Sequence, residues 1–139
     1  MSEIKNAHQS TSTAETDMYL RTLVGTVTGN SFEFPITLYV GGIVVTGFLA
    51  SGHRFFDDLG EQFQRFFDSD VANALTKGAR EPYLVEKNTK ELPLDHIHLR
   101  EARMITPGQP PIPYDGVWWR GRLASVNGFH MGILTVGQN

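Results

Sequence analysis

Apolar and polar residues alternate with the period of a strand in the first third of the chain. Residues 32–40 are apolar at every second position, and a second apolar run, residues 43–50, follows the pair Gly41-Gly42. A period of two predicts strands with one buried face, and a Gly-Gly pair between them predicts a tight turn. Pro35 cannot donate to a ladder and is expected at an edge or a bulge, while Gly47 is expected to bend its strand. The pattern predicts a strongly bent β-hairpin.

The same alternation recurs in the last third of the chain. Residues 95–105 place apolar and polar side chains on opposite faces, which predicts a half-buried strand. Residues 117–126 and 129–136 also have strand patterns and are separated by Asn127-Gly128, the strongest short signal for a hairpin. A bridge rich in proline and glycine, residues 106–116, precedes them. Together with the first hairpin, these segments predict a five-stranded antiparallel sheet.

Two other segments have the period of a helix. Residues 17–27 carry apolar side chains at helical spacing, and Asp17 is a suitable N-cap, although several β-branched residues leave a strand as the alternative. A helix is also predicted from Ser51, where aromatic and aliphatic residues recur at spacings of three and four. It continues, or restarts at Ser69-Asp70, to about Leu75. Its apolar stripe comprises Phe55, Phe56, Leu59, Phe63, Phe66 and Phe67.

That stripe has two interpretations. Six large apolar residues on one helix face are most often part of a core. Alternatively, the stripe is partly exposed and associates with a second copy. A domain this small has little surface with which to hide so many aromatic residues, and a homo-oligomer is therefore expected.

Length and composition indicate one domain of mainly β, α+β class. The chain has 139 residues, of which 40% are apolar and 19% charged. Residues 17–136 are expected to form one globular domain, residues 1–16 and 137–139 to be tails, and residues 77–94 to be a mobile loop. The predicted fold is a small, strongly bent five-stranded sheet or open barrel, with an N-terminal helix and an inserted Phe-rich helix.

Charge and cysteine content narrow the function classes. A formal net charge of −3 and a pI near 5.9 give no basic field for phosphate backbones or anionic lipid. The absence of cysteine removes disulfides, thiol nucleophiles and Cys-based zinc sites. No run approaches the roughly 18–20 apolar residues of a membrane span, and no secretory signal is visible. A cytoplasmic location without membrane partners is expected.

Two histidines are the only candidates for a metal site. His96 and His98 project from the same strand face, about 6.5–7 Å apart, which suits two ligands of one ion. A third ligand would have to come from elsewhere in the chain, for which the candidates are Asp95, Glu101, His53 and His130. In the alternative interpretation both histidines face solvent on a half-exposed strand. We expect no bound metal and no other cofactor.

The two adjacent tryptophans suggest a contact surface. Trp118 and Trp119 must point to opposite faces of a strand, so one can anchor the core while the other shares an outer face with Arg120 and Arg122. That face could bind an acidic partner, stack an unpaired base, or simply hold a cation–π contact. The candidates for partner or self-contact are Trp118, Arg120, Arg122, Phe63, Phe66 and Phe67.

Catalytic motifs are missing from the sequence. It has no Gly-x-Ser-x-Gly elbow, no phosphate-binding loop and no Ser, His and Asp arrangement that the predicted elements would bring together. No catalytic residue is predicted, and a non-enzymatic function is expected.

The ordered segments resemble the gas vesicle accessory protein U (GvpU) family. The resemblance is carried by residues 38–47 followed by an aromatic helix, then 97–99, then 119–124 and 126–129. It implies a cytoplasmic accessory protein that is associated with gas vesicles and affects how they assemble or cluster. Its partners would be the gas vesicle shell or other gas vesicle proteins.

A second similarity is to Sm-like proteins, in which a helix precedes a bent five-stranded sheet. It is carried by residues 41–47 and by the pairing of 97–99 with 119–121. This resemblance implies an alternative function as a module that binds single-stranded RNA. The insertion from residue 53 to 75 and the acidic charge balance both depart from it, and binding of nucleic acid is not expected.

Overall fold

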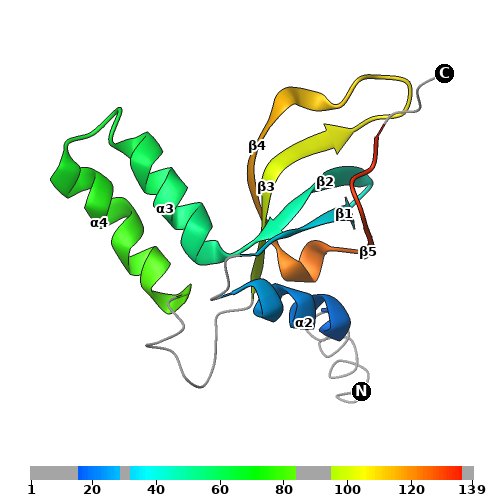
Figure 1. The fold of residues 1–139 in the computed structure, drawn as a ribbon, viewed down its shortest axis with the longest axis horizontal. Helices are drawn as coiled ribbons and strands as arrows, with labels where there is room; N and C mark the ends of the chain where they lie inside the picture. The colour runs from blue at the N-terminus through cyan, green and yellow to red at the C-terminus, as the bar shows by residue number, and fades with distance from the viewer. Residues whose placement is uncertain (1–15, 29–31, 84–94, 136–139) are drawn as a thin grey trace, which may run out of the picture.

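A computed structural model describes residues 16–28, 32–83 and 95–135 of the chain. Its strands form one antiparallel sheet in the order β4-β3-β2-β1-β5, which is open between its two edges. The mainly β, α+β fold with a five-stranded sheet is confirmed. The elements in chain order are α2 Met18–Val27, β1 Phe34–Val40, β2 Ile43–Ala50, α3 Gly52–Phe63, α4 Ser69–Arg80, the 3-10 turn η1 Glu81–Tyr83, β3 His96–Ile105, β4 Ile112–Arg122, the 3-10 turn η3 Leu123–Ser125 and β5 Gly128–Met131 (Figure 1).

Glycines shape the sheet where the sequence predicted turns and bends. Gly41 and Gly42 connect β1 to β2 with φ values of 54° and 86°, which an L side chain rarely adopts. The β2–β3 register shifts between Thr46 and Phe48. A Cβ on the intervening Gly47 would lie 3.0 Å from the carbonyl oxygen of Arg100. Gly47 therefore lies opposite a bulge of β3, where the close backbone favours a residue without a side chain.

The main core lies between α2 and one face of the sheet. Asp17 caps α2 by accepting from the amides of Tyr19 at 2.9 Å and Leu20 at 3.2 Å, as the sequence predicted. Leu20 and Val27 are fully buried against the strands. The other fully or nearly buried apolar side chains of this core are Val24, Ile36, Leu38, Val45, Leu49, Ile97, Leu99, Ala102, Leu123 and Val126.

Pro35 lies at the end of a ladder rather than on an edge strand. Strand β1 is flanked by β2 and β5, so it is an interior strand. The β1–β5 pairing begins at Ile36, opposite Met131. Pro35 is one residue beyond it, where its carbonyl accepts from the Gly132 amide at 2.9 Å and no amide hydrogen is needed.

The hairpin predicted at Asn127-Gly128 is wrong. β4 begins at Ile112, inside the predicted bridge, and ends at Arg122, and β5 pairs with β1 at the opposite edge of the sheet instead of with β4. Between them, Leu123 of η3 and Val126, which directly follows η3, are buried in the main core. The chain passes in this way from one edge of the sheet to the other. Asn127 then bonds β1 and its turn: its amide donates to the Tyr39 carbonyl at 2.7 Å, and its side chain accepts from the Gly41 amide at 2.8 Å.

The strand predicted over residues 129–136 is also shorter than expected. β5 ends at Met131, and Gly132 has a φ of 100°. The following chain bonds to two buried threonines: Thr37 donates to the Gly132 carbonyl and Thr46 accepts from the Leu134 amide, both at 2.8 Å. These bonds satisfy hydroxyl groups that would otherwise be costly to bury.

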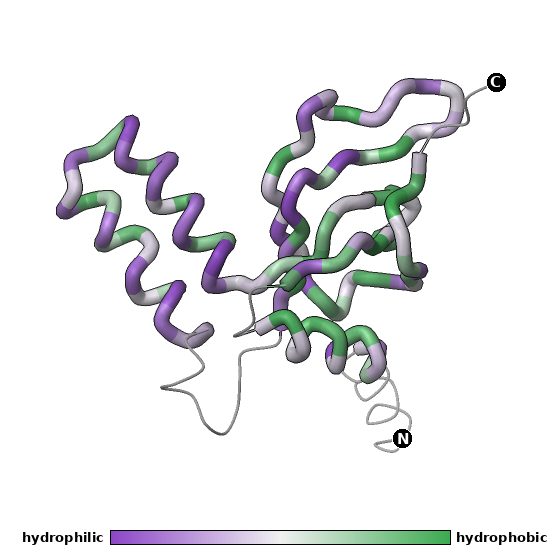
Figure 2. Tube along the Cα trace, in the orientation of Figure 1, coloured by the Kyte–Doolittle hydropathy of each residue, from purple (hydrophilic) through white to green (hydrophobic). Residues whose placement is uncertain are grey.

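The Phe-rich segment forms a helical hairpin that projects from the sheet (Figure 1). The chain turns after Phe63 and the helix restarts at Ser69, one of the two predicted positions. Ser51 caps α3 through the Arg54 amide at 3.1 Å, and Asp68 caps α4 through the Val71 amide at 2.9 Å. α4 continues past Leu75 to Arg80 and is followed by η1, so the loop predicted from residue 77 is wrong over residues 77–83. Apolar and polar residues alternate around both helices in Figure 2.

Other predictions fall outside the described residues. They are the tail over residues 1–15, the rest of the loop over residues 84–94, and the C-terminal tail. No helix in the part of the chain that the structure describes is long and apolar enough to cross a membrane.

Candidate functional site

A second, smaller core holds the helical hairpin against the sheet. Phe55 and Phe56 of α3 and Tyr83 of η1 are buried together, and Leu59 and Trp118 pack against them. The ring centroids of Phe55 and Phe56 lie 4.9 Å apart in an edge-to-face arrangement, and those of Phe55 and Trp118 lie 5.5 Å apart in the same arrangement. We call these five side chains the aromatic seat. They fix the position of the hairpin on the outer face of β3 and β4.

His98 lies inside the aromatic seat and not in solvent. It is 1% exposed, and its ring centroid lies 4.8 Å from that of Phe55 and 5.6 Å from that of Tyr83. Burial, followed by the charges of Arg120 and His96, lowers the pKa of His98 to about 3. Its Nε2 atom has no hydrogen-bond partner among the described residues. The expected solvent-facing orientation is thus wrong for His98, because the hairpin covers this face of β3.

The pair His96 and His98 does not form a visible metal centre. The two side chains share a strand face as predicted, but one is sealed beneath aromatic rings and the other is half-buried. Burial, and then the nearby charge of Arg120, also lower the pKa of His96. In the described ranges, no three histidine or carboxylate side chains are grouped so that they could hold an ion. None of the possible third ligands Asp95, Glu101, His53 and His130 completes such a group with the pair among these residues.

Trp118 and Trp119 point to opposite faces, as predicted, but neither is open to solvent. Trp119 packs against the main core and Trp118 is half-buried beneath α3. The Trp118 indole Nε1 donates to Asp58 of α3 at 2.9 Å. The guanidinium carbon of Arg120 lies 5.3 Å from the Phe56 ring centroid, the cation–π contact that was one of the alternatives. The expectation of an open tryptophan for base stacking is wrong, because α3 covers it.

The bond between Trp118 and Asp58 gives a first test of this seat. Trp118→Phe keeps the aromatic contact but removes the donor, and it is expected to lower the free energy of unfolding by about 1 kcal/mol in urea titrations. Asp58→Asn is the matched variant, because its amide oxygen still accepts, and it should cost clearly less. Equal stabilities of Trp118→Phe and the unmodified chain would show that the hydrogen bond does not support docking.

Ion pairs reinforce the base of the hairpin. Glu33, which precedes β1, accepts from Arg54 of α3 at 2.6 Å and from Arg100 of β3 at 2.7 Å. Its side chain is only 9% exposed. A nearly buried carboxylate that bridges two arginines ties α3 to the sheet more firmly than an exposed pair would. In the same region, Asp57 of α3 is paired with Arg80 of α4.

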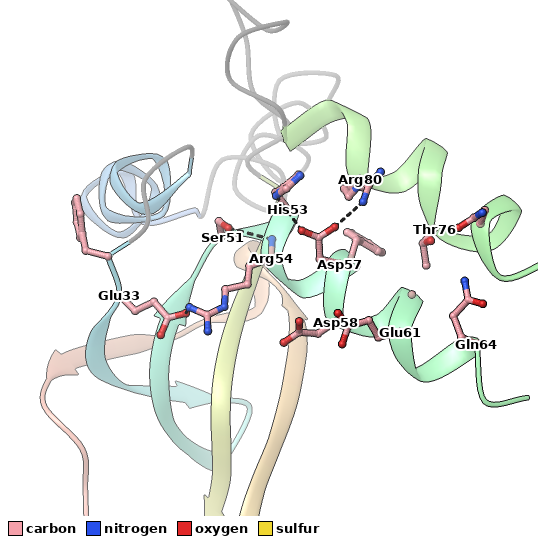
Figure 3. A pocket seen from close by; sticks show the side chains of 14 residues that line it. Glu33, Ser51, His53, Arg54, Asp57, Asp58, Glu61, Gln64, Thr76 and Arg80 are labelled. Carbon is pink, nitrogen blue, oxygen red and sulfur yellow. Dashed lines mark hydrogen bonds and ion pairs between the residues drawn. The ribbon is translucent and has the colours of Figure 1, made fainter. Parts of the chain in front are cut away.

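A polar cleft of about 630 Å³ opens between the two helices of the hairpin. Figure 3 shows its acidic side chains Asp57, Asp58 and Glu61 on α3, with Thr76 and Arg80 across from them on α4. Arg54 and Arg80, its two guanidinium groups, are already bound to carboxylates. Among the described residues that line the cleft, neither arginine is therefore left unpaired to hold an anionic ligand. A second groove of about 610 Å³ runs between α3 and β4 over the aromatic seat.

The far part of the hairpin exposes large apolar side chains. Phe66 is 77% exposed, Phe67 45%, Val71 41% and Leu75 50%. Phe63 is half-buried and touches Phe67 edge-to-face, with ring centroids 5.9 Å apart. The stripe predicted from the sequence is therefore divided: its first part fills the aromatic seat and its last part is open. The open part is a group of large exposed apolar side chains, which is a feature often found where proteins make contacts.

Several residues of these sites were missed from the sequence. Tyr83 lay in a segment interpreted as a polar loop, and Glu33 and Asp58 are common surface residues whose partners are distant in the chain. The exposed face formed by Val71 and Leu75 could have been predicted from their spacing in the sequence. They are four residues apart and share one face, while the buried Ala72 and Thr76, one position further and about 100° around the helix, mark the face that packs inward.

The fold and these sites define a small α+β protein with an open sheet and an exposed apolar arm. Residues 17–134 match the family of gas vesicle protein GvpU-like chains, and the protein belongs to this family. It is therefore related to gas vesicles, and its family has no known enzymatic activity. Neither a curated protein nor a solved structure matches the chain.

Proposed function

We propose that this protein is a non-enzymatic accessory protein that self-associates and organises or clusters gas vesicles in the cytoplasm. Its partners would be the vesicle shell or other gas vesicle proteins. The observation that carries the proposal is the gathering of four exposed apolar side chains on the projecting part of one helical hairpin. Membership of a gas vesicle family supplies the context in which that surface acts.

The shape of the hairpin suits a bridging function. Its base is fixed to the sheet by the aromatic seat and by the Glu33 ion pairs, so its far end is held away from the sheet in a defined direction. A self-associating chain presents several copies of this end, and repeated copies raise the avidity of links between particles by about 10²–10⁴-fold.

Clustering of purified gas vesicles tests the proposal. We expect added protein to cluster vesicles, measured by light microscopy and by the rate of flotation. The variant Phe66→Ser/Phe67→Ser should need at least about tenfold more protein for the same clustering, because it removes the two aromatic side chains at the hairpin turn.

The control variant is Tyr114→Ser. Tyr114 of β4 is 88% exposed, so its loss removes an exposed aromatic ring of the sheet without disturbing either core. It should cluster vesicles as the unmodified protein does. The proposal fails if the unmodified protein leaves vesicles dispersed, or if the variants at the hairpin and on the sheet behave alike.

A further inference from the structure

Helix α4 has an outer face that nothing in the described chain covers. It packs on α3 and η1, and in Figure 1 it lies on the side of α3 away from the sheet. Ala72 and Thr76 face α3, where Thr76 Oγ1 lies 3.2 Å from the position of a Cβ on Gly60. Val71 and Leu75, in contrast, are 41% and 50% exposed. A 12-residue helix thus buries one face and leaves an apolar face unpartnered.

The exposed face is continuous along the helix. At 100° per residue, Val71, Ala74, Leu75 and Gly78 fall within an arc of about 100°. Ala74 and Gly78 are exposed, and a Cβ on Gly78 would meet no atom within 4 Å. Glycine in a helix costs about 1 kcal/mol relative to alanine, and no contact with another described residue requires it here. Small residues in the middle of the face allow a second helix to approach closely.

Charges on one flank of this face decide what can cover it. Asp70 in the first turn and Lys77 in the last turn are exposed, and neither has an ion-pair partner among the described residues. They are seven residues apart, which is two turns or about 10.5 Å on the same side of the helix. In an antiparallel pair of identical helices, Asp70 of each chain faces Lys77 of the other. In a parallel pair, twofold symmetry places this flank on opposite sides of the contact, so no Asp70–Lys77 pair forms.

We propose that α4 pairs with α4 of a second copy of this chain, antiparallel across a twofold axis near Ala74. The proposal rests on the self-association in the function proposed above and names its surface and geometry. Val71 and Leu75 of each chain are covered by the other, and the two Asp70–Lys77 pairs fix the direction. Because α4 is only about 18 Å long, the contact is at the small end of protein interfaces. The dimer is therefore weak, with a dissociation constant on the order of 10–100 µM.

Reversal of the two charges tests the pairing without vesicles. We expect sedimentation equilibrium of the full chain between about 5 and 500 µM to show a monomer–dimer equilibrium. Asp70→Lys or Lys77→Asp alone should weaken the dimer about tenfold, because each creates two repulsive contacts by symmetry. The double variant restores both attractive pairs and should return to within about threefold of the unmodified chain. Tyr114→Ser, on the sheet, should have no effect.

A second measurement reads the geometry directly. The chain has no cysteine, so Ala74→Cys introduces a single thiol near the twofold axis. On mild oxidation at 100 µM it should form a disulfide-linked dimer, because that bond needs Cα atoms about 4.4–6.8 Å apart. Tyr114→Cys should remain largely unlinked.

Three results would overturn the pairing: a chain that stays monomeric at 500 µM, a dimer indifferent to either charge reversal, or single variants that weaken the dimer while the double variant does not restore it. Circular dichroism of each variant establishes that α4 is still folded. The sedimentation and cross-linking measurements contain no vesicles. A failure of this dimer can therefore be told apart from a failure of the protein to cluster vesicles.

Discussion

Replacing Phe55 by alanine is expected to lower the free energy of unfolding by about 3–5 kcal/mol, the cost of removing a buried phenylalanine. Phe55 is 9% exposed and is the central ring of the aromatic seat, in contact with Phe56, His98 and Trp118. The loss should be concentrated in docking of the hairpin, because this cluster is separate from the main core. Urea titration gives the total, and amide hydrogen exchange should show faster exchange in α3 and α4 than in the sheet.

Phe66→Ala is the matched variant on the same hairpin. Phe66 is 77% exposed, so its replacement should change the free energy of unfolding by no more than about 0.5 kcal/mol. The two substitutions are chemically identical, and only their burial differs. Similar losses in both variants would contradict the division of the apolar stripe into a seat and an exposed end.

Local signals in the sequence were sufficient for many elements of this fold. Asp17 and Ser51 cap the helices that the apolar spacing predicted, and Gly41-Gly42 turns between the strands of the first hairpin. Gly47 is at a bulge because the backbone of β3 approaches it closely. Each of these features depends on a few neighbouring residues, and a capping oxygen or a positive φ restricts the possible residue types directly.

The errors arose where a distant segment decides the structure. Asn127-Gly128 suits a two-residue hairpin, but burial of Leu123 and Val126 and the free side of β1 draw β5 to the opposite edge. The alternation around His98 shows which residues share a face and cannot show what covers that face. The cover includes Phe55 and Phe56 of α3, which lie more than 40 positions earlier in the sequence. Trp118 was expected to be exposed to solvent for the same reason, because the alternation does not show that α3 covers it.

Acidification from pH 7 to pH 5 is expected to destabilise the protein through His98. In the folded chain, burial among aromatic rings, followed by the charges of Arg120 and His96, lowers the pKa of His98 to about 3. In the unfolded chain it should be near 6.5. The folded state therefore binds fewer protons, so the contribution of His98 is fully present above about pH 6.5 and declines as the pH falls toward 3.

The expected size of this effect is large for one side chain. Between pH 6.5 and 3 the free energy of unfolding should fall by about 1.4 kcal/mol per pH unit, which amounts to about 2 kcal/mol at pH 5. His96 acts in the same direction, since its pKa is also lowered, first by burial. The unperturbed pKa of histidine, about 6.5, lies between pH 7 and pH 5, so the change over this range reports mainly on histidines.

His98→Leu should remove this dependence and His98→Gln should do the same, because neither side chain titrates. Urea titrations at pH 7, 6 and 5 measure the difference, and His96→Asn separates the smaller contribution of the neighbouring histidine. In a Trp119→Phe background, fluorescence of Trp118 reports whether the hairpin leaves the sheet first, since Trp118 contacts the hairpin through Phe55 and Asp58. If His98→Leu loses as much stability between pH 7 and pH 5 as the unmodified chain, His98 is not the group that couples docking of the hairpin to pH.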